Sequence, residues 1–204
     1  MSGERQLAEI AAAAARLVVE EGAEYAAAKQ RAARDLGRRG GRAVELPGNE
    51  QLEDAVREHI ALFCADEQPG ELDALRQLAR RWMQRLAGFR PHLAGAVWRG
   101  TATRRSAIHL DLYCDDPKAA QIELINAGVD FDSAQIDPPG RSGREPLQVL
   151  SLADRVPGWP EPVTLHLTLH DHDDLRGALR PDARGRTWRG DLAGLERLLG
   201  EEHR

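Results

Sequence analysis

Residues 95–113 have the sequence GAVWRGTATRRSAIHLDLY, and this stretch decides the fold of the 204-residue chain. Its first part carries two glycines, Gly95 and Gly100, within a basic segment. Its second part alternates hydrophobic with polar residues from Ile108 to Tyr113. Alternation is typical of a strand whose two faces differ, and glycine permits a tight turn beside it. The stretch therefore predicts a glycine turn and a basic loop that lead into a strand.

Upstream of this stretch, the hydrophobic residues recur with the helical period. An alanine-rich helix is predicted over residues 4–35, with a break at Gly22. Residues 36–48 contain glycines and a proline without periodicity, and they predict a linker. Asn49 is the expected N-cap of a second helix, and a third follows Pro69 and ends near Gly88. The inward face of the second helix is predicted to be Leu52, Val56, His59, Ile60 and Phe63.

Downstream, the pattern predicts more strands and two helices. Residues 93–98 are expected to form a short strand, and Asp116-Pro117 to begin a helix that ends at Gly128. A last helix begins at Asp191. Further strands are predicted over residues 129–135, 147–153 and 163–170. The fold class is therefore α+β, with a helical region over residues 1–90 and a mixed-sheet α/β domain over residues 91–204.

Composition limits the classes of partner. The net charge of −5 argues against a broad nucleic-acid-binding face. Only Lys29 and Lys118 are lysines among 28 basic residues, a skew typical of a GC-rich bacterial genome, so arginine clusters carry little weight. Cys64 and Cys114 stand alone, as expected of reduced thiols in the cytoplasm. No stretch has the pattern of a signal peptide or membrane span, so we expect a cytoplasmic protein without a membrane partner.

The stretch 95–113 resembles the signature of the polymerase-beta-type nucleotidyltransferase superfamily. In that family a Gly-Ser turn follows the first strand, a basic glycine-containing loop comes next, and a strand then begins Ser-Asp-hydrophobic-Asp. Gly95, the run from Arg99 to Ala102, and Ser106 fall at the family spacing without a gap. The resemblance implies a nucleotide-binding site at Gly95, Arg99, Gly100, Thr101 and Ser106. It also implies a nucleotide as ligand and Mg²⁺ or another divalent metal as cofactor.

The departures from the family fall on its chemistry. Two carboxylates at positions i and i+2 of one strand point to one face, where they bridge two metal ions, and a third comes from a later strand. Here Ala96 replaces the family's serine, Ala107 its first aspartate and His109 its second. A register shifted by two would instead pair His109 with Asp111 and keep one carboxylate. In either register, binding of Mg²⁺ is expected to weaken because this ion prefers oxygen ligands.

The polar residues of these strands remain candidate site residues. His109 and Asp111 are the candidate catalytic residues, and Asp111, His109 and His166 the candidate metal ligands. A hydrogen-bonded His-Asp pair on a solvated sheet face is the simpler alternative. The arginine-rich loop of residues 177–191 either covers the cleft as a phosphate-binding flap or ties the last helix to the sheet.

Three functions follow from these observations. The first is a degenerate nucleotidyltransferase-like protein that binds nucleotide or regulates, with ordinary Mg²⁺-dependent transfer in doubt. The second is an active nucleotidyltransferase with a non-standard His/Asp metal site. The third is a protein-interaction module in which residues 1–90 dock a protein partner or form a homo-oligomer. Whether the protein is an enzyme is left open by the sequence.

Overall fold

The structure is a computed structural model that describes residues 2–37, 45–137, 145–182 and 184–202. Contacts between residues divide the chain into two compact units. The first comprises Met1–Leu72 and Thr101–Ser106, and the second comprises Asp73–Gly100 and Ala107–Arg204. The expected domains, residues 1–90 and 91–204, stay a prediction; in this division the residues from Asp73 onward of the helix Gln68–Arg85 belong to the second unit.

The first unit is helical. Its helices are α1 (Ser2–Glu21), α2 (Tyr25–Gly37), α3 (Asn49–Phe63) and the first turn of α4 (Gln68–Arg85). The predicted break at Gly22 is confirmed: this glycine has φ +70°, a conformation that ends α1. The apolar faces of α1 and α3 meet in one core with α2 that includes Ile10, Ala14, Val18, Ala28, Leu52 and Val56. The predicted linker falls largely on residues 38–44, outside the described residues.

Two details of α3 differ from the prediction. Gly48, not Asn49, occupies the N-cap position, and its backbone N–H donates to the Gln51 side chain at 2.8 Å. Phe63 does not face inward; as the last residue of the helix it is 71% exposed.

The second unit contains a six-stranded mixed sheet in the order β3-β4-β5-β2-β1-β6. Its central strands β2 (Ile108–Cys114) and β5 (Val163–Asp171) are parallel, and every other neighbouring pair is antiparallel. The outer strands are β1 (His92–Ala94), β3 (Asp132–Ile136), β4 (Leu147–Asp154) and β6 (Arg189–Gly190). The remaining helices are α5 (Gly95–Arg99), α6 (Pro117–Asn126), α7 (Leu192–Glu202) and the 3₁₀ turns η1 (Ala87–Phe89) and η2 (His172–Leu175). The predicted α+β class, with N-terminal helices before the sheet, is confirmed.

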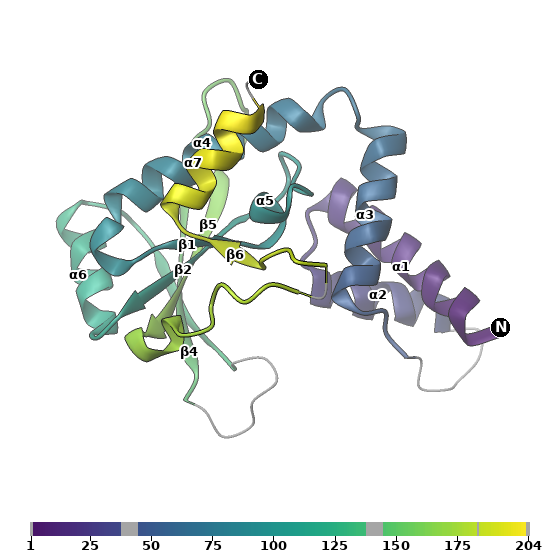
Figure 1. The fold of residues 1–204 in the computed structure, drawn as a ribbon, viewed down its shortest axis with the longest axis horizontal. Helices are drawn as coiled ribbons and strands as arrows, with labels where there is room; N and C mark the ends of the chain where they lie inside the picture. The colour runs from purple at the N-terminus through teal and green to yellow at the C-terminus, as the bar shows by residue number, and fades with distance from the viewer. Residues whose placement is uncertain (1, 38–44, 138–144, 183, 203–204) are drawn as a thin grey trace. The chain divides into compact units, whose positions relative to one another are not determined.

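The end of β1 and one of its neighbours in the sheet differ from the sequence prediction. The strand ends at Ala94, and residues 95–98 belong to the short helix α5. Gly95 causes the change of direction, since its φ of +67° cannot continue a strand. The two-residue strand β6 was not predicted; it pairs with β1 and leads directly into α7 (Figure 1).

The sheet has one leucine-rich face and one polar face. Leu110 of β2, Leu167 of β5 and Leu150 of β4 are opposite one another and fully buried. Alternate residues of the same strands point to the other face, where the polar side chains gather. Because that face is partly solvent-accessible, it is the part of the sheet on which chemistry can take place.

Candidate functional site

Two parallel strands place the polar side chains of the site in register. His109 is opposite His166, Asp111 opposite Thr168, and Tyr113 opposite His170. In a strand, residues separated by two share a face, so all six side chains lie on the polar face. The alternation from Ile108 to Tyr113 predicted which side chains of β2 share this face, whereas the pairing of β2 with β5 was not predicted.

Asp111 is the centre of an ion-pair network. His170 Nε2 lies 3.0 Å from Asp111 Oδ1, and Arg189 lies 2.7 Å from Asp111 Oδ2. The same guanidinium donates to the Tyr113 hydroxyl at 2.6 Å, and the Tyr113 and His170 rings stack with centroids 5.1 Å apart. Both oxygens of Asp111 are thus engaged by cationic or imidazole nitrogens, and its side chain is only 11% exposed.

The surroundings also shift the pKa values of Arg189 and Tyr113. Burial acts to lower the pKa of Arg189, but the charge of Asp111 and the contact with Tyr113 outweigh it and raise that pKa above its usual value. Burial is the main reason why the pKa of Tyr113 is raised, against the opposing effect of Arg189. The guanidinium therefore stays charged and the phenol stays protonated at neutral pH, which favours a permanent Arg189–Asp111 ion pair.

His109 and His166 form a second cluster on the same face. Their rings stack with centroids 5.1 Å apart, and Ser151 Oγ lies 2.9 Å from His166 Nδ1. In the part of the chain that the structure describes, no three His, Cys, Asp or Glu side chains lie where they would hold one metal ion. The predicted set of Asp111, His109 and His166 is therefore not assembled here, since Asp111 turns to Arg189 and His170.

The predicted phosphate-side residues of the second unit have structural partners. Arg99 is buried and forms an ion pair with Asp182 at 3.2 Å, while its guanidinium stacks on the Trp188 ring at 4.3 Å. Gly100 caps α5 with φ +78°. Gly95 is exposed, and a Cβ added to it would lie 3.3 Å from the His109 ring. Arg99 thus fastens the loop before β6, whereas Gly95 lies against the histidine cluster.

Thr101 and Ser106, the other predicted nucleotide-binding residues, belong to the first unit. Thr101 is buried, with its hydroxyl 3.5 Å from that of Tyr25. The Ser106 hydroxyl accepts a hydrogen bond from the Thr103 backbone within the loop. Thr101 thus contacts a helix of its own unit and Ser106 bonds within the loop, and their role in nucleotide binding stays a prediction.

The larger cavity of the second unit, about 1120 Å³, opens beside the carboxyl ends of β2 and β5. Ligands of open α/β sheets bind at this end of parallel strands. Tyr113, His170, Trp188 and Arg189 contribute to its wall, together with the exposed Arg176. His170 lies in the strand predicted over residues 163–170, but nothing in the sequence indicated that Arg189 joins Asp111 from a strand of two residues. The loop of residues 177–191 leads through β6 into α7, and its residues Arg180, Pro181 and Trp188 also line the cavity, so both alternatives for this loop stay predictions.

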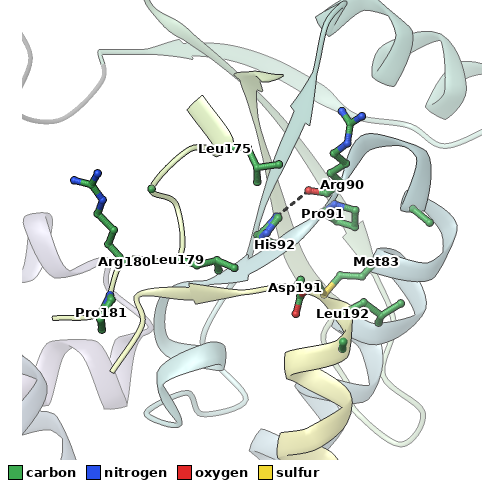
Figure 2. Close-up of a pocket in the computed structure, with 13 residues that line it drawn as sticks. Met83, Arg90, Pro91, His92, Leu175, Leu179, Arg180, Pro181, Asp191 and Leu192 are labelled. Atoms are coloured by element: carbon green, nitrogen blue, oxygen red, sulfur yellow. Dashed lines mark hydrogen bonds between the residues drawn. The ribbon is translucent and has the colours of Figure 1, made fainter. Parts of the chain in front are cut away.

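A smaller cavity of about 700 Å³ is lined by residues of α4, α7 and the loop before β6 (Figure 2). Met83, Leu179 and Leu192 provide apolar walls, and His92 lies among them. The backbone carbonyl of Arg90 accepts a hydrogen bond from His92 Nδ1 at 2.9 Å. None of the predicted catalytic, metal-binding or nucleotide-binding residues lines this cavity, but Arg180 of the loop of residues 177–191 does.

Comparison with known proteins gives structural matches alone. No protein-family model matches the chain, and no curated protein matches it. Among solved structures, Cid1 poly(U) polymerase with MgGTP bound matches at 12% identity and a TM-score of 0.34 over 52% of this chain and 33% of that one. A cytoplasmic RNA terminal U-transferase matches at 17% identity and a TM-score of 0.36, over 55% of this chain and 36% of that one. Cid1 in complex with ApU matches at 18% identity and a TM-score of 0.33, over 54% and 32%.

The chain spans about a third of the length of these solved proteins. At these TM-scores the matches support no argument about this chain, so its substrate and activity are inferred below from its own residues alone. Among the described residues, no helix is long and apolar enough to cross a membrane.

Proposed function

We propose that this chain is a nucleotidyltransferase-like protein that binds a nucleotide without ordinary Mg²⁺-dependent nucleotidyl transfer. The observation that supports this best is the register of β2 with β5, which sets His109 opposite His166 on the polar face. Ala107 precedes His109 by two residues, so this face presents two imidazoles and an alanine where the resembled family presents carboxylates. Imidazole is a poor ligand for Mg²⁺, which prefers hard oxygen atoms.

The larger cavity is the proposed nucleotide site. Its volume of about 1120 Å³ is sufficient for a nucleotide, and its wall combines aromatic rings with guanidinium groups. Arg176 is exposed at this wall, where it would bind phosphate oxygens, and Trp188 and Tyr113 provide flat apolar surface. Acidic residues of η2 line the same cavity, so we expect a ligand that also offers hydrogen-bond donors, as a base and ribose do.

Calorimetric titration with each of the four nucleoside triphosphates tests the proposal. We expect binding to at least one of them with the same affinity in Mg²⁺ and in EDTA, and no release of pyrophosphate. Arg176→Ala is expected to weaken binding about three- to tenfold, as for a partly solvated charge-assisted hydrogen bond. Arg197→Ala, which removes an exposed arginine of α7 away from the cavity, is the matched control.

Two results would decide against the proposal in different ways. Absence of binding at millimolar concentration of all four triphosphates would remove the nucleotide site. Pyrophosphate release with Mg²⁺ or Mn²⁺ that is lost in both His109→Ala and Asp111→Ala would favour an active enzyme with a non-standard metal site instead.

A second candidate function is protein docking through the N-terminal helices. Leu62 and Phe63 are adjacent at the end of α3 and are 69% and 71% exposed. Neighbouring large apolar side chains in solvent mark interaction sites more often than single ones do. Light scattering of the wild type and of a Leu62→Glu/Phe63→Glu variant tests this: a self-associating protein should become smaller, and an unchanged mass would argue against a homo-oligomer formed here.

A further inference from the structure

The smaller cavity of the second unit, about 700 Å³, has the composition of a small-molecule site. Its volume is within the usual range of roughly 300–1,000 Å³ for such sites. Most of its wall is apolar, with Met83, Leu175 and Leu192 as its larger side chains, and the polar groups come from two arginines, one histidine and one aspartate. An apolar cavity with few polar groups fixes a ligand through those groups, so their chemistry indicates which ligand fits.

His92 is the buried polar group of this cavity, with 6% of its surface exposed. Its Nδ1 lies 2.9 Å from the backbone carbonyl of Arg90, and because a carbonyl oxygen only accepts, the neutral ring carries its proton on Nδ1. Nε2 is then a hydrogen-bond acceptor. Among the residues that the structure describes, no donor to Nε2 is found. Since buried polar groups are normally hydrogen-bonded, this nitrogen favours a ligand that donates to it.

The orientation of the imidazole is fixed on two sides. Arg90, whose carbonyl holds Nδ1, has φ +47°, a conformation that residues other than glycine rarely adopt. The edge of the His92 ring meets the Tyr113 ring at an interplanar angle of 86°, with centroids 5.1 Å apart. The acceptor at Nε2 is therefore organised before any ligand binds.

Asp191 supplies the second acceptor of the cavity, together with a negative charge. Its Oδ1 accepts a hydrogen bond from the backbone N–H of Gly194 at 2.8 Å, which caps α7 and leaves Oδ2 to accept from a ligand. The positive end of the α7 dipole is equivalent to only about half an elementary charge, so the full charge of the carboxylate outweighs it. Figure 2 shows the guanidinium groups of Arg90 and Arg180 directed away from Asp191.

From these features we propose that the smaller cavity binds an organic amine, that is, an apolar body with a primary ammonium group. The apolar walls enclose the body, and the ammonium group donates hydrogen bonds to His92 Nε2 and to the Asp191 carboxylate. A carboxylate or phosphate ligand fits poorly because it only accepts hydrogen bonds, as these two groups do. The site does not rest on the proposed nucleotide site, with which it shares only Gly177, Arg180 and Pro181.

Calorimetric titration with four compounds of one naphthyl body, in the absence of nucleotide, tests the proposal. They are 2-(1-naphthyl)ethylamine, its N,N,N-trimethyl derivative, 2-(1-naphthyl)ethanol and 3-(1-naphthyl)propanoate. We expect the primary amine to bind about tenfold more tightly than the trimethyl compound, which has no N–H, and than the alcohol, which has no charge. The propanoate should bind most weakly. Equal affinities for all four compounds, or tightest binding of the propanoate, would overturn the proposal.

Three carboxylate variants show which cavity the amine occupies. Asp191→Asn should weaken binding of the amine about tenfold and leave that of the alcohol unchanged, and the variant keeps its fold because asparagine caps a helix as well as aspartate does. Glu196→Gln, which removes an exposed carboxylate of α7 outside the cavity, is the matched control. Asp173→Asn removes a carboxylate of the larger cavity. An amine affinity that falls in Asp173→Asn but not in Asp191→Asn would overturn the proposal.

The result is distinguishable from that for the nucleotide site. The nucleotide proposal depends on titration with triphosphates and on Arg176, which lines only the larger of the two cavities. Binding of the amine that is lost in Asp191→Asn would therefore support the smaller site even if no triphosphate binds. Absence of amine binding at millimolar concentration would overturn it even if a triphosphate does bind.

Discussion

Replacing Asp111 by alanine should cost the second unit about 2 kcal/mol of its free energy of unfolding. Breaking a fully buried ion pair from one side costs ~3–5 kcal/mol, whereas an exposed pair contributes ~0–1 kcal/mol. Asp111 is 11% exposed and Arg189 is 29% exposed, so the pair lies nearer to the buried limit but is partly solvated. The loss includes the unpaired Arg189 guanidinium, the Tyr113 contact and the hydrogen bond to His170.

A double-mutant cycle isolates the pair from these other contributions. Asp111→Ala, Arg189→Ala and the double variant are unfolded in urea and followed by tryptophan fluorescence, which reports the second unit because Trp82, Trp98, Trp159 and Trp188 all belong to it. The expected coupling energy is ~1.5 kcal/mol or more, and raising the salt to 1 M should change it little because a partly buried pair is weakly screened. A coupling energy below ~0.5 kcal/mol would refute the reasoning that this ion pair holds β6 to the sheet.

Three further predictions concern other parts of the chain. Gly190→Ala should destabilise the second unit by ~2 kcal/mol or more in the same urea assay, since its Cβ would lie 2.0 Å from the Trp98 ring. Gly200 has open space around it, so Gly200→Ala should leave the stability unchanged or raise it slightly. Gly22→Ala should lower the melting temperature measured from the helical circular dichroism signal, because Gly22 has φ +70° and an added Cβ would lie 2.3 Å from the Arg105 carbonyl oxygen. Gly3→Ala is the control, and equal melting curves for the two variants would contradict the prediction. Burial acts to raise the pKa of Asp182, but hydrogen bonds from Arg186, Arg184 and Arg99 outweigh it and lower that pKa. Asp182→Asn should therefore be less stable than the wild type at pH 7. The difference should begin to shrink below the ordinary value of about 4 and be lost only as the pH falls through the lowered pKa of the folded protein; a constant difference would exclude this carboxylate as its source.

Local patterns predicted the elements of the fold well where one face of an element is apolar over its whole length. The helical period of residues 4–35 and the strict alternation around Leu110 each gave the right element. Two short elements were missed or misassigned for the same reason. Strand β6 has two residues, and α5 has five, so neither is long enough to show a period. Their conformations depend on Gly95 and on pairing with β1 rather than on a pattern of their own.

The site was predicted in part: the residues that alternate along one strand were predicted, but their partners from distant parts of the sequence were not. His109, Asp111 and His166 were singled out because they alternate on strands, and the structure places them on one face. Their partners could not be predicted. Arg189 reaches Asp111 across 78 positions of sequence through a strand pairing that only the folded sheet creates, and Arg99, which resembles a phosphate-binding residue, is instead paired with Asp182.

The two polar clusters of the sheet leave different possibilities for chemistry. Asp111 has both oxygens engaged by Arg189 and His170, so a metal ion would have to displace a cation from a charge-assisted pair before it could bind there. In the other cluster, Ser151 Oγ lies 2.9 Å from His166 Nδ1, and the His166 and His109 rings stack with centroids 5.1 Å apart. The Asp111 network therefore holds β6 to the carboxyl ends of β2 and β5, and the histidine cluster lies on the same face outside it.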